Sequence, residues 1–311
     1  MKNTSPTFLL LVALMGCLIN ANAQNMVPNP GFEELNTCPS EQSQLNATKN
    51  WHSLRETPDY FNTCAKPGMS PTQFNAGIPR NTWGYQPAAY GEGYAGIMLY
   101  YSPQVDFREF LTVKLKEPLI SGRRYQISFV VSLANHGGRN PPHMSCNNLG
   151  ILFNFGSIEG IPNFAHAFID TLIEDTLQWV EVKFNYLADQ AYTHLAIGNF
   201  FDDANTIKNK TSFFSQYAFY YIDEVKVIAN RPQIVIHPNP VTEQVFITSS
   251  EDFSPDVSCK MYSVNGQRIN IEAILHSSNQ LSIYFEAYRP GIYILRLRDK
   301  AEVWQEKILK I

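Results

Sequence analysis

The last quarter of the chain opens with His237-Pro238-Asn239-Pro240-Val241 and closes with Lys307-Ile308-Leu309-Lys310-Ile311. Between these ends, apolar residues recur at every second position, first at Val245 and Ile247 and again at Tyr293, Leu295 and Leu297. Alternation with a period of two places successive side chains on opposite faces of a strand. The turn formers Pro290-Gly291 punctuate the apolar segments. This stretch therefore predicts a small β-sandwich of about seven strands, in the immunoglobulin-like size range.

The same stretch carries further motifs in a fixed order. Met261-Tyr262-Ser263-Val264-Asn265-Gly266-Gln267 comes first, and Tyr288-Arg289-Pro290-Gly291-Ile292-Tyr293-Ile294 follows before the apolar-basic tail. Together with the Pro-Asn-Pro opening, these segments resemble the C-terminal sorting domain of type IX secretion cargo in gliding and oral Bacteroidetes. The resemblance covers residues 233–311. It implies an exported passenger domain followed by a sorting signal that the type IX secretion machinery recognises. It also implies that this signal is removed on export. Any activity then lies upstream.

The first 23 residues have the composition of a signal peptide. Lys2 supplies a positive charge, Phe8 to Ile19 is apolar, and Ala21-Asn22-Ala23 offers a small-x-small cleavage site. The apolar run is too short for a permanent membrane anchor. The alternative is a lipoprotein signal at Leu14-Met15-Gly16-Cys17, in which Met15 would be unusual. We favour ordinary cleavage before Gln24, which predicts a secreted or cell-surface protein.

Composition places the rest of the chain in the all-β class. The 311 residues suffice for about two domains. Hydrophobic residues make up 44%, charged residues only 17%, and there are 20 Phe and 16 Tyr. A composition rich in aromatics and poor in charge favours β-sandwiches over helical bundles. The net charge is −4 and the longest basic cluster is Arg123-Arg124, which excludes a nucleic-acid-binding surface.

Residues 24–229 are predicted to form the passenger domain, and Asn230-Arg231-Pro232 a short linker, because Pro discourages continued strand pairing. No helical period is evident, and only Phe164 to Asp175 is ambiguous. Apolar segments separated by turn clusters predict a jelly-roll β-sandwich with Greek-key connections. The expected strands are Phe110–Leu115, Tyr125–Val131, Leu149–Phe155, Trp179–Tyr186 and His194–Phe201.

Both ends of this domain carry recognisable motifs. Asn29-Pro30-Gly31-Phe32-Glu33 reads as a tight turn entering a first strand, and Tyr221-Ile222-Asp223-Glu224-Val225 lies on the last. In this order they resemble the ends of jelly-roll carbohydrate-binding modules of the calcium-containing type. Thr57–Cys64, Tyr90–Ile97 and Phe107–Leu111 resemble an N-terminal module of Bacteroidetes surface proteins, some of which carry OmpA-like domains. No OmpA-like domain follows here. The resemblance implies a non-catalytic, glycan-binding protein.

The resemblance to these modules also implies a structural Ca²⁺ held by the carbonyl of Gly31 and the carboxylates of Glu33 and Asp223. These are oxygen ligands of the kind that Ca²⁺ prefers. Such an ion would brace the fold and would not act in catalysis. The alternative is that both carboxylates are ordinary strand-end residues.

Aromatic side chains supply the candidate ligand site. Trp83-Gly84-Tyr85 lies in a Gly- and Pro-rich region with several further tyrosines. Flat aromatic faces can stack on sugar rings, so we predict Trp83 and Tyr85 as glycan contacts. The alternative is that they belong to the core, as most aromatics in a β-sandwich do.

Signal cleavage leaves four cysteines, Cys38, Cys64, Cys146 and Cys259, which can pair in three ways. We predict a Cys38–Cys64 disulfide, because the two are near in sequence and both lie in loop-like, Pro-containing segments. The bridge would contribute roughly 3–4 kcal/mol. Cys146 and Cys259 are expected to be free or buried. A zinc site is conceivable at His136, His143 and Cys146, but a fourth ligand is missing and the spacing fits no standard zinc pattern. We therefore favour a surface loop for this segment.

The tripeptide Asp-Thr-Leu occurs at Asp170-Thr171-Leu172 and again at Asp175-Thr176-Leu177. It resembles the O-glycosylation sequon of exported Bacteroidetes proteins and implies Thr171 and Thr176 as acceptors. Catalytic signatures are absent: there is no Gly-x-Ser-x-Gly elbow and no His-Glu-x-x-His helix. The pairs Glu33-Glu34 and Asp202-Asp203 point to opposite faces if on strands. A surface adhesion protein and a polysaccharide hydrolase or lyase remain the alternatives.

Overall fold

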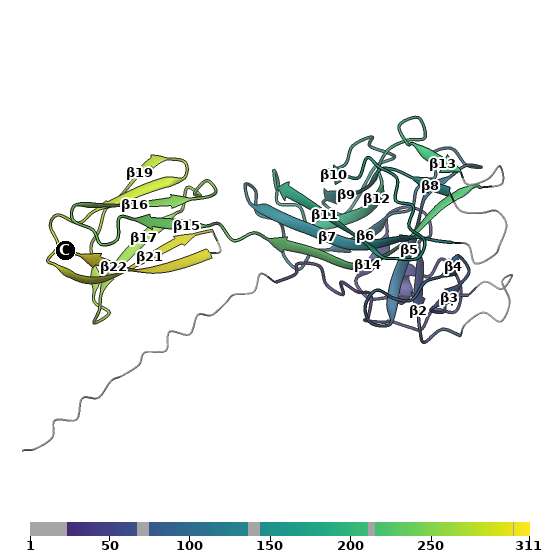
Figure 1. The fold of residues 1–311 in the computed structure, drawn as a ribbon, viewed down its shortest axis with the longest axis horizontal. Coiled ribbons are helices and arrows are strands. Elements are labelled where there is room, and N and C mark those ends of the chain that lie inside the picture. The colour runs from purple at the N-terminus through teal and green to yellow at the C-terminus, as the bar shows by residue number, and fades with distance from the viewer. Residues whose placement is uncertain (1–23, 67–74, 136–143, 211–214, 301) are drawn as a thin grey trace, which may run out of the picture.

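The protein is described by a computed structural model of residues 24–66, 75–135, 144–210, 215–300 and 302–311. The regular structure of these residues consists of strands, with a single turn of 3-10 helix, η1 (Leu45–Ala47). They make two bodies that are joined by one extended connection (Figure 1). The prediction of an all-β chain is confirmed. The predicted signal peptide, residues 1–23, lies outside the described residues.

The upstream domain is a sandwich of two antiparallel five-stranded sheets (Figure 1). Sequence neighbours are rarely neighbours in either sheet, so the chain crosses repeatedly between the layers, as in a jelly roll. The first sheet has the order β1 (Trp51–Ser53), β6 (Leu111–Lys114), β12 (His194–Asn199), β9 (Leu149–Asn154) and β10 (Ala167–Phe168). The second has the order β11 (Val180–Leu187), β7 (Arg124–Leu133), β14 (Tyr217–Ala229), β5 (Gly93–Tyr101) and β2 (Asp59–Asn62). Two small ribbons, β3 (Arg80–Asn81) with β4 (Gly84–Tyr85) and β8 (Met144–Cys146) with β13 (Lys208–Lys210), complete it.

The core between the sheets follows the period of two seen in the sequence. On β7, Tyr125, Ile127, Phe129 and Val131 are buried, while Gln126 is exposed. Burial of such apolar surface is the main term that stabilises the sandwich. The ambiguous segment from Phe164 to Asp175 contains the short strand β10 and no helix.

In the second sheet, β2 and β5 are buried on both faces, which the alternation alone does not predict. All residues of β5 except Tyr101 are buried. Its outer face packs with Phe61, Phe219 and Tyr221 into a second apolar cluster that segment 76–88 covers. At Gly96 on β5, a Cβ would lie 2.6–2.7 Å from ring atoms of Phe61 and Phe219. Glycine is therefore required for the rings to approach the strand.

The N-terminal segment corrects one expectation. The turn at Asn29 to Phe32 is present, with the Phe32 amide bonded to the Asn29 carbonyl, but no strand follows at Phe32-Glu33. Phe32 has a φ of 60° and its ring packs 4.7 Å from that of Trp51, so the chain turns inward. The preceding residues run beside β14, where Val225 N–H donates to the Pro30 carbonyl. The two ends of the domain do meet, as expected.

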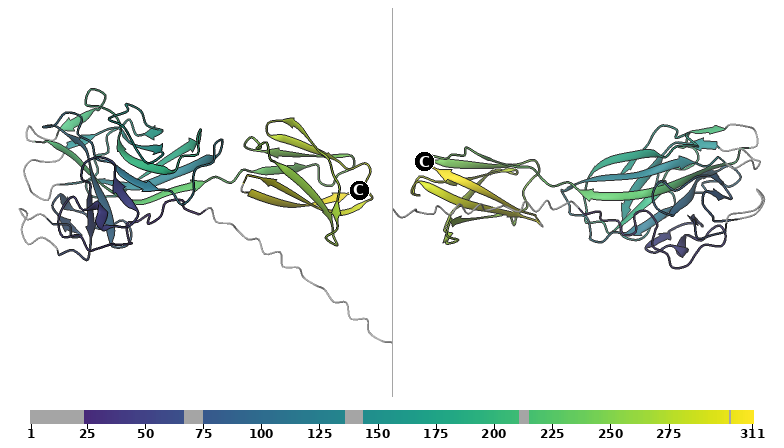
Figure 2. Two further views of the ribbon diagram at one scale, coloured as in Figure 1. Left: turned by 180° about the vertical axis from the view of Figure 1, so that it is seen from behind. Right: turned by 60° about the horizontal axis from the view of Figure 1, so that its bottom comes forward.

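The C-terminal domain is a smaller sandwich of two four-stranded sheets, eight strands where about seven were expected. One sheet has the order β15 (Ile234–His237), β16 (Gln244–Ser249), β20 (Gln280–Tyr284) and β19 (Ala273–Ser277). The other has β18 (Arg268–Ile269), β17 (Ser258–Ser263), β21 (Gly291–Asp299) and β22 (Glu302–Lys310). Val245, Ile247, Leu295 and Leu297 form its core, as their alternation predicts. The C-terminus lies at the end far from the upstream domain (Figure 2).

Only residues 230–233 separate β14 from β15. Across the described ranges, no sheet combines strands from the two domains. The same ranges contain no helix with the length and apolar character of a membrane span.

Candidate functional site

The cysteines behave as the sequence predicts. Cys38 and Cys64 form a disulfide with a Cα–Cα distance of 5.9 Å. Cys146 is free and buried, and Cys259 is free and half-buried. Burial raises the pKa of both free thiols to about 12, so neither is a ready nucleophile or metal ligand. His136 and His143, the other members of the weak zinc set, lie outside the described residues.

Glu33 and Asp223 together hold one surface loop, residues 89–93. Both Glu33 oxygens accept the Glu92 N–H at 2.9 Å, and Oε1 also accepts the Gly93 N–H at 3.0 Å. Asp223 Oδ2 accepts the N–H groups of Ala89 and Tyr90, each at 3.1 Å. The loop is thus fixed by one carboxylate from the N-terminal segment and one from the last strand.

The surroundings of Asp223 are acidic. Burial raises its pKa to about 8, against hydrogen bonds from Tyr90 and Glu224 that lower it, and the Glu224 and Glu33 carboxylates raise it further. A Cβ at Gly31 would lie 3.3 Å from Glu224 Oε1, 3.6 Å from Asp223 Oδ1 and 3.7 Å from Glu33 Cγ. Three acidic side chains therefore surround the space that the missing side chain of Gly31 leaves open.

This arrangement has the oxygen chemistry that Ca²⁺ prefers. Among the described residues, however, no three His, Cys, Asp or Glu side chains are arranged as a formed metal centre. The Glu33 carboxylate is already bonded to backbone N–H groups. Asp223 accepts backbone N–H groups in the same way. An ion beside Gly31 would therefore rely on Glu224 and backbone carbonyls, together with the remaining lone pairs of Asp223 and Glu33. The residues fit calcium in kind, and calcium remains a prediction.

Trp83 and Tyr85, the predicted glycan contacts, have different surroundings. The Trp83 ring stacks on Phe219, with centroids 4.2 Å apart and an angle of 15°, and its Nε1–H donates to buried Asp59. One face of the indole therefore belongs to the cluster that covers the second sheet. Tyr85 is 48% exposed, and the Arg80 guanidinium lies 5.7 Å from its ring centroid. Tyr85 presents a ring to solvent, and its sugar contact stays a prediction.

Sequence reasoning missed a larger group of aromatics at one edge of the sandwich. Phe155 and Phe164 are 61% and 53% exposed. Their rings connect through Tyr192 and His166: Phe155 lies 5.1 Å from Tyr192, Tyr192 5.1 Å from His166, and His166 5.2 Å from Phe164. The signal was the lone Phe155 at the end of an apolar strand, followed by Phe164 in the segment without a clear period. We call Phe155, Phe164, His166, Tyr186 and Tyr192 the edge patch.

Polar groups are built into the edge patch. The hydroxyls of Tyr186 and Tyr192 both donate to the Asp189 carboxylate, and the Tyr186 bond, together with smaller contributions, lowers the pKa of Asp189. The Phe153 N–H donates to His166 Nδ1 at 3.0 Å, so the ring proton lies on Nε2. Burial lowers the pKa of His166 despite the opposing effect of Asp189. At neutral pH the patch therefore carries an anionic acceptor and a neutral imidazole.

The predicted acceptors Thr171 and Thr176 lie in the connection between β10 and β11, where Thr171 is exposed and Thr176 half-buried. Their glycosylation stays a prediction. Of the paired acidic residues, Asp203 bonds to the buried Arg108 at 2.9 Å. Asp202 accepts hydrogen bonds from Asn163 and Asn205. These contacts give both aspartates structural roles.

Two further carboxylates, Asp59 and Glu109, are buried. Burial raises the pKa of Asp59 to about 6 and the pKa of Glu109 well above its ordinary value. The nearby Asp59 carboxyl group raises the pKa of Glu109 further. Both accept protein N–H donors, Asp59 from Ser43 and Glu109 from Met98. With almost no surface exposed, neither is placed to meet a polysaccharide directly.

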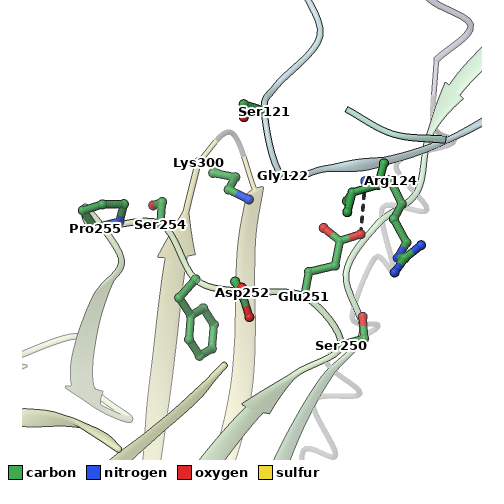
Figure 3. Close-up of a pocket in the computed structure, with 11 residues that line it drawn as sticks. Ser121, Gly122, Arg124, Ser250, Glu251, Asp252, Ser254, Pro255 and Lys300 are labelled. Atoms are coloured by element: carbon green, nitrogen blue, oxygen red, sulfur yellow. Dashed lines mark hydrogen bonds between the residues drawn. The ribbon is translucent and has the colours of Figure 1, made fainter. Parts of the chain in front are cut away.

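A cleft of about 420 Å³ lies between the two domains (Figure 3). The turn at Ser121–Arg124 forms one side, and residues 250–255 with Lys300 form the other. The Arg124 N–H donates to Glu251 Oε1 at 3.3 Å across it. Its lining has charges of both signs and no exposed tyrosine or tryptophan face for a sugar. We interpret it as the polar junction of the domains.

Comparison with solved structures finds several similar chains, at low sequence identity. The structure of TmCBM61 in complex with β-1,4-galactotriose has 13% sequence identity and a TM-score of 0.34, covering 67% of this chain and 100% of that chain. The Clostridium thermocellum xylanase 10B CBM22-1–GH10 structure with xylohexaose has 12% identity and a TM-score of 0.33, covering 71% and 30%. Bacteriophage CBA120 tailspike protein 4 has 14% identity and a TM-score of 0.31, covering 66% and 21%. Curated protein sequences give no significant match.

The C-terminal domain gives a direct match to a family model. Residues 235–311 match the secretion system C-terminal sorting domain. The match begins within β15 and ends with the chain, so it spans the whole smaller sandwich. The protein is therefore secreted or displayed at the cell surface. The chain carries, as its second domain, a C-terminal sorting domain of the type IX secretion family.

Proposed function

We propose that the upstream domain is a non-catalytic module that binds carbohydrate outside the cell. The observation that carries the proposal is the edge patch, a continuous set of rings ending in two exposed phenylalanines. Exposed aromatic residues on a soluble surface mark interaction sites when they are contiguous and rimmed by polar groups. Sugars combine apolar ring faces with hydroxyls, and an aromatic surface with polar groups matches both.

The charge distribution disfavours the hydrolase or lyase alternative. Hydrolysis of a glycosidic bond needs two carboxyl groups that face each other across an accessible substrate. The described carboxylates with the most strongly raised pKa values, Glu109 and Asp223, are buried and hydrogen-bonded to backbone N–H groups. These two carboxyl groups therefore suit a structural role better than a catalytic role in an accessible cleft.

A screen with the chain from Gln24 to Ile311 tests the proposal. We expect retention on a glycan array and retarded migration in affinity gels that contain the bound polysaccharide. Retardation by none of a broad panel of neutral and acidic polysaccharides would overturn it. Capture of an outer-membrane protein that no sugar competes away would favour the adhesion alternative.

Structural calcium is a second and separate proposal. The three acidic side chains around Gly31 repel one another, and Ca²⁺ would neutralise them and brace the junction of the first and last segments. We expect calcium to raise the melting temperature and EGTA to lower it. Identical melting curves in calcium and in EGTA would exclude the ion.

A further inference from the structure

The edge patch lies where the two sheets of the sandwich meet at their edges. β10 is the last strand of the first sheet, and β11 is the last strand of the second (Figure 1). Phe155 directly follows β9, His166 directly precedes β10, and Phe164 lies two residues before His166. Tyr186 lies on β11, and Asp189 and Tyr192 lie between β11 and β12. Side chains from several segments therefore converge on one surface.

Buried side chains underneath the edge patch hold its rings in place. Phe153 and Tyr192 are buried, and Tyr186 stacks on Phe153 with centroids 5.0 Å apart and an angle of 20°. His166 is fixed by the hydrogen bond from the Phe153 N–H. Phe155 and Phe164 stand at the two ends of this supported row. A surface that is already ordered loses little entropy when a ligand binds.

The polar groups of the patch suit hydroxyls and disfavour anions. The Asp189 carboxylate, held by two tyrosine hydroxyls, keeps acceptor capacity for a sugar O–H, because a carboxylate has about four lone-pair sites. His166 supplies one N–H donor from Nε2. The negative charge of Asp189 would repel uronic acids and sulfated sugars. An apolar protein surface would in turn cover the remaining acceptor sites of Asp189 without supplying a donor to them, at a cost.

We infer that the edge patch is the carbohydrate site, with Phe155 and Phe164 as stacking platforms and Asp189 as the hydroxyl acceptor, and that its ligand is a neutral polysaccharide. This inference rests on the proposed function and places it on residues other than Trp83 and Tyr85. The spacing of the two exposed phenylalanines along one row favours an extended chain of sugars over a single residue.

The test compares single variants of the full chain in affinity gels with the neutral polysaccharide that the array selects. Phe155→Ala and Phe164→Ala should each weaken binding about tenfold, which corresponds to roughly 1.4 kcal/mol. Asp189→Asn should also weaken it, since the charged acceptor is lost. Leu177→Ala is the matched control, because Leu177 is 74% exposed and precedes the opposite end of β11. It should bind as the unmodified protein does.

The outcomes separate this inference from the proposed function. If the unmodified chain binds a neutral polysaccharide and Phe155→Ala and Phe164→Ala bind it equally well, the site assignment is wrong and the proposed function stands. If Tyr85→Ala alone abolishes binding, the site lies at Tyr85 on β4 and not at the edge patch. Selection of acidic glycans only would overturn the ligand class. If nothing binds to the unmodified chain, both ideas fail. Melting curves of each variant establish that it is folded.

Discussion

The carboxyl group of Asp223 makes the stability of this protein depend on pH in an unusual direction. Its pKa is raised to about 8 from the ordinary 3.8, chiefly by burial. A folded-state pKa above the unfolded one means that folding takes up a proton at neutral pH. The stabilising effect of the neutral carboxyl is complete below about pH 4 and is lost as the pH rises through 8. Most aspartates have a lowered pKa in the folded state, and their contribution to stability is lost as the pH falls.

The magnitude follows from the two pKa values. Between pH 5 and pH 8 the unfolded state remains ionised while the folded state gives up its proton, at 1.36 kcal/mol for each pH unit until the folded-state pKa is reached. This makes the free energy of unfolding about 4 kcal/mol smaller at pH 8 than at pH 5, from Asp223 alone. Part of the raised pKa of Asp223 comes from the neighbouring carboxylates of Glu224 and Glu33.

Asp223→Asn isolates this contribution, because asparagine stays neutral at every pH. Urea unfolding in EGTA at pH 5 and pH 8 should show that the difference in stability between the variant and the unmodified protein changes by about 4 kcal/mol in favour of the variant at pH 8. Asp59 and Glu109 titrate in both proteins, so they cancel. If the free energies of unfolding of the two proteins changed in parallel with pH, the raised pKa of Asp223 would be refuted.

Calcium should change the outcome at pH 8. Ca²⁺ binds the ionised carboxylate, so millimolar calcium should restore the stability of the unmodified protein and leave Asp223→Asn unaffected. Equal stabilisation of both proteins by calcium would show that the ion binds elsewhere.

Three further predictions concern the scaffold. Cys38→Ser should lower the free energy of unfolding by roughly 3 kcal/mol, because the disulfide closes a loop with a sequence separation of 26. Melting curves of the variant and of the unmodified protein, with and without reductant, measure this loss, and identical curves would contradict the prediction. Gly96→Ala should cost about 1–3 kcal/mol in urea unfolding, since the new Cβ meets two aromatic rings; an unchanged midpoint would contradict that packing. Glu302→Gln should weaken the contact between the domains by about 1–3 kcal/mol, because Arg123, nearly buried and 2.6 Å from Glu302, loses its ion pair. Small-angle scattering should then show a wider spread of domain arrangements with both domains still folded, and an unchanged profile would mean that the pair does not hold the domains.

Much of the fold follows from local patterns. The period of two in Tyr125 to Val131 and in Val245 to Ile247 predicts strands with one buried face, and both are observed. The neighbouring loop cysteines Cys38 and Cys64 predict their own disulfide. The sorting domain is recognisable because its motifs come in a fixed order along the chain.

The candidate site does not follow in this way. Trp83 was predicted as a glycan contact, and that contact stays a prediction. What the sequence did not show is that one face of its ring stacks on Phe219, because the outer face of β5 and β14 is apolar and segment 76–88 covers it. Sequence alternation assigns residues to one face or the other of a strand, but it does not say which faces a distant segment will cover. The exposure of Tyr85 beside a packed Trp83 has the same cause.

The sequence by itself therefore determined the all-β class, the sorting domain and the disulfide, because each depends on residues close together in the chain. Only the tertiary structure decided which aromatics reach solvent and how strongly each carboxyl group is buried. Phe155, Phe164 and Tyr192 form one row because β9, β10, β11 and β12 bring separate connections to one edge of the sandwich. The raised pKa of Asp223 arises because its strand closes against the N-terminal segment and excludes water. Contacts between residues far apart in sequence are set by the packing of the sheets, and no local pattern encodes them.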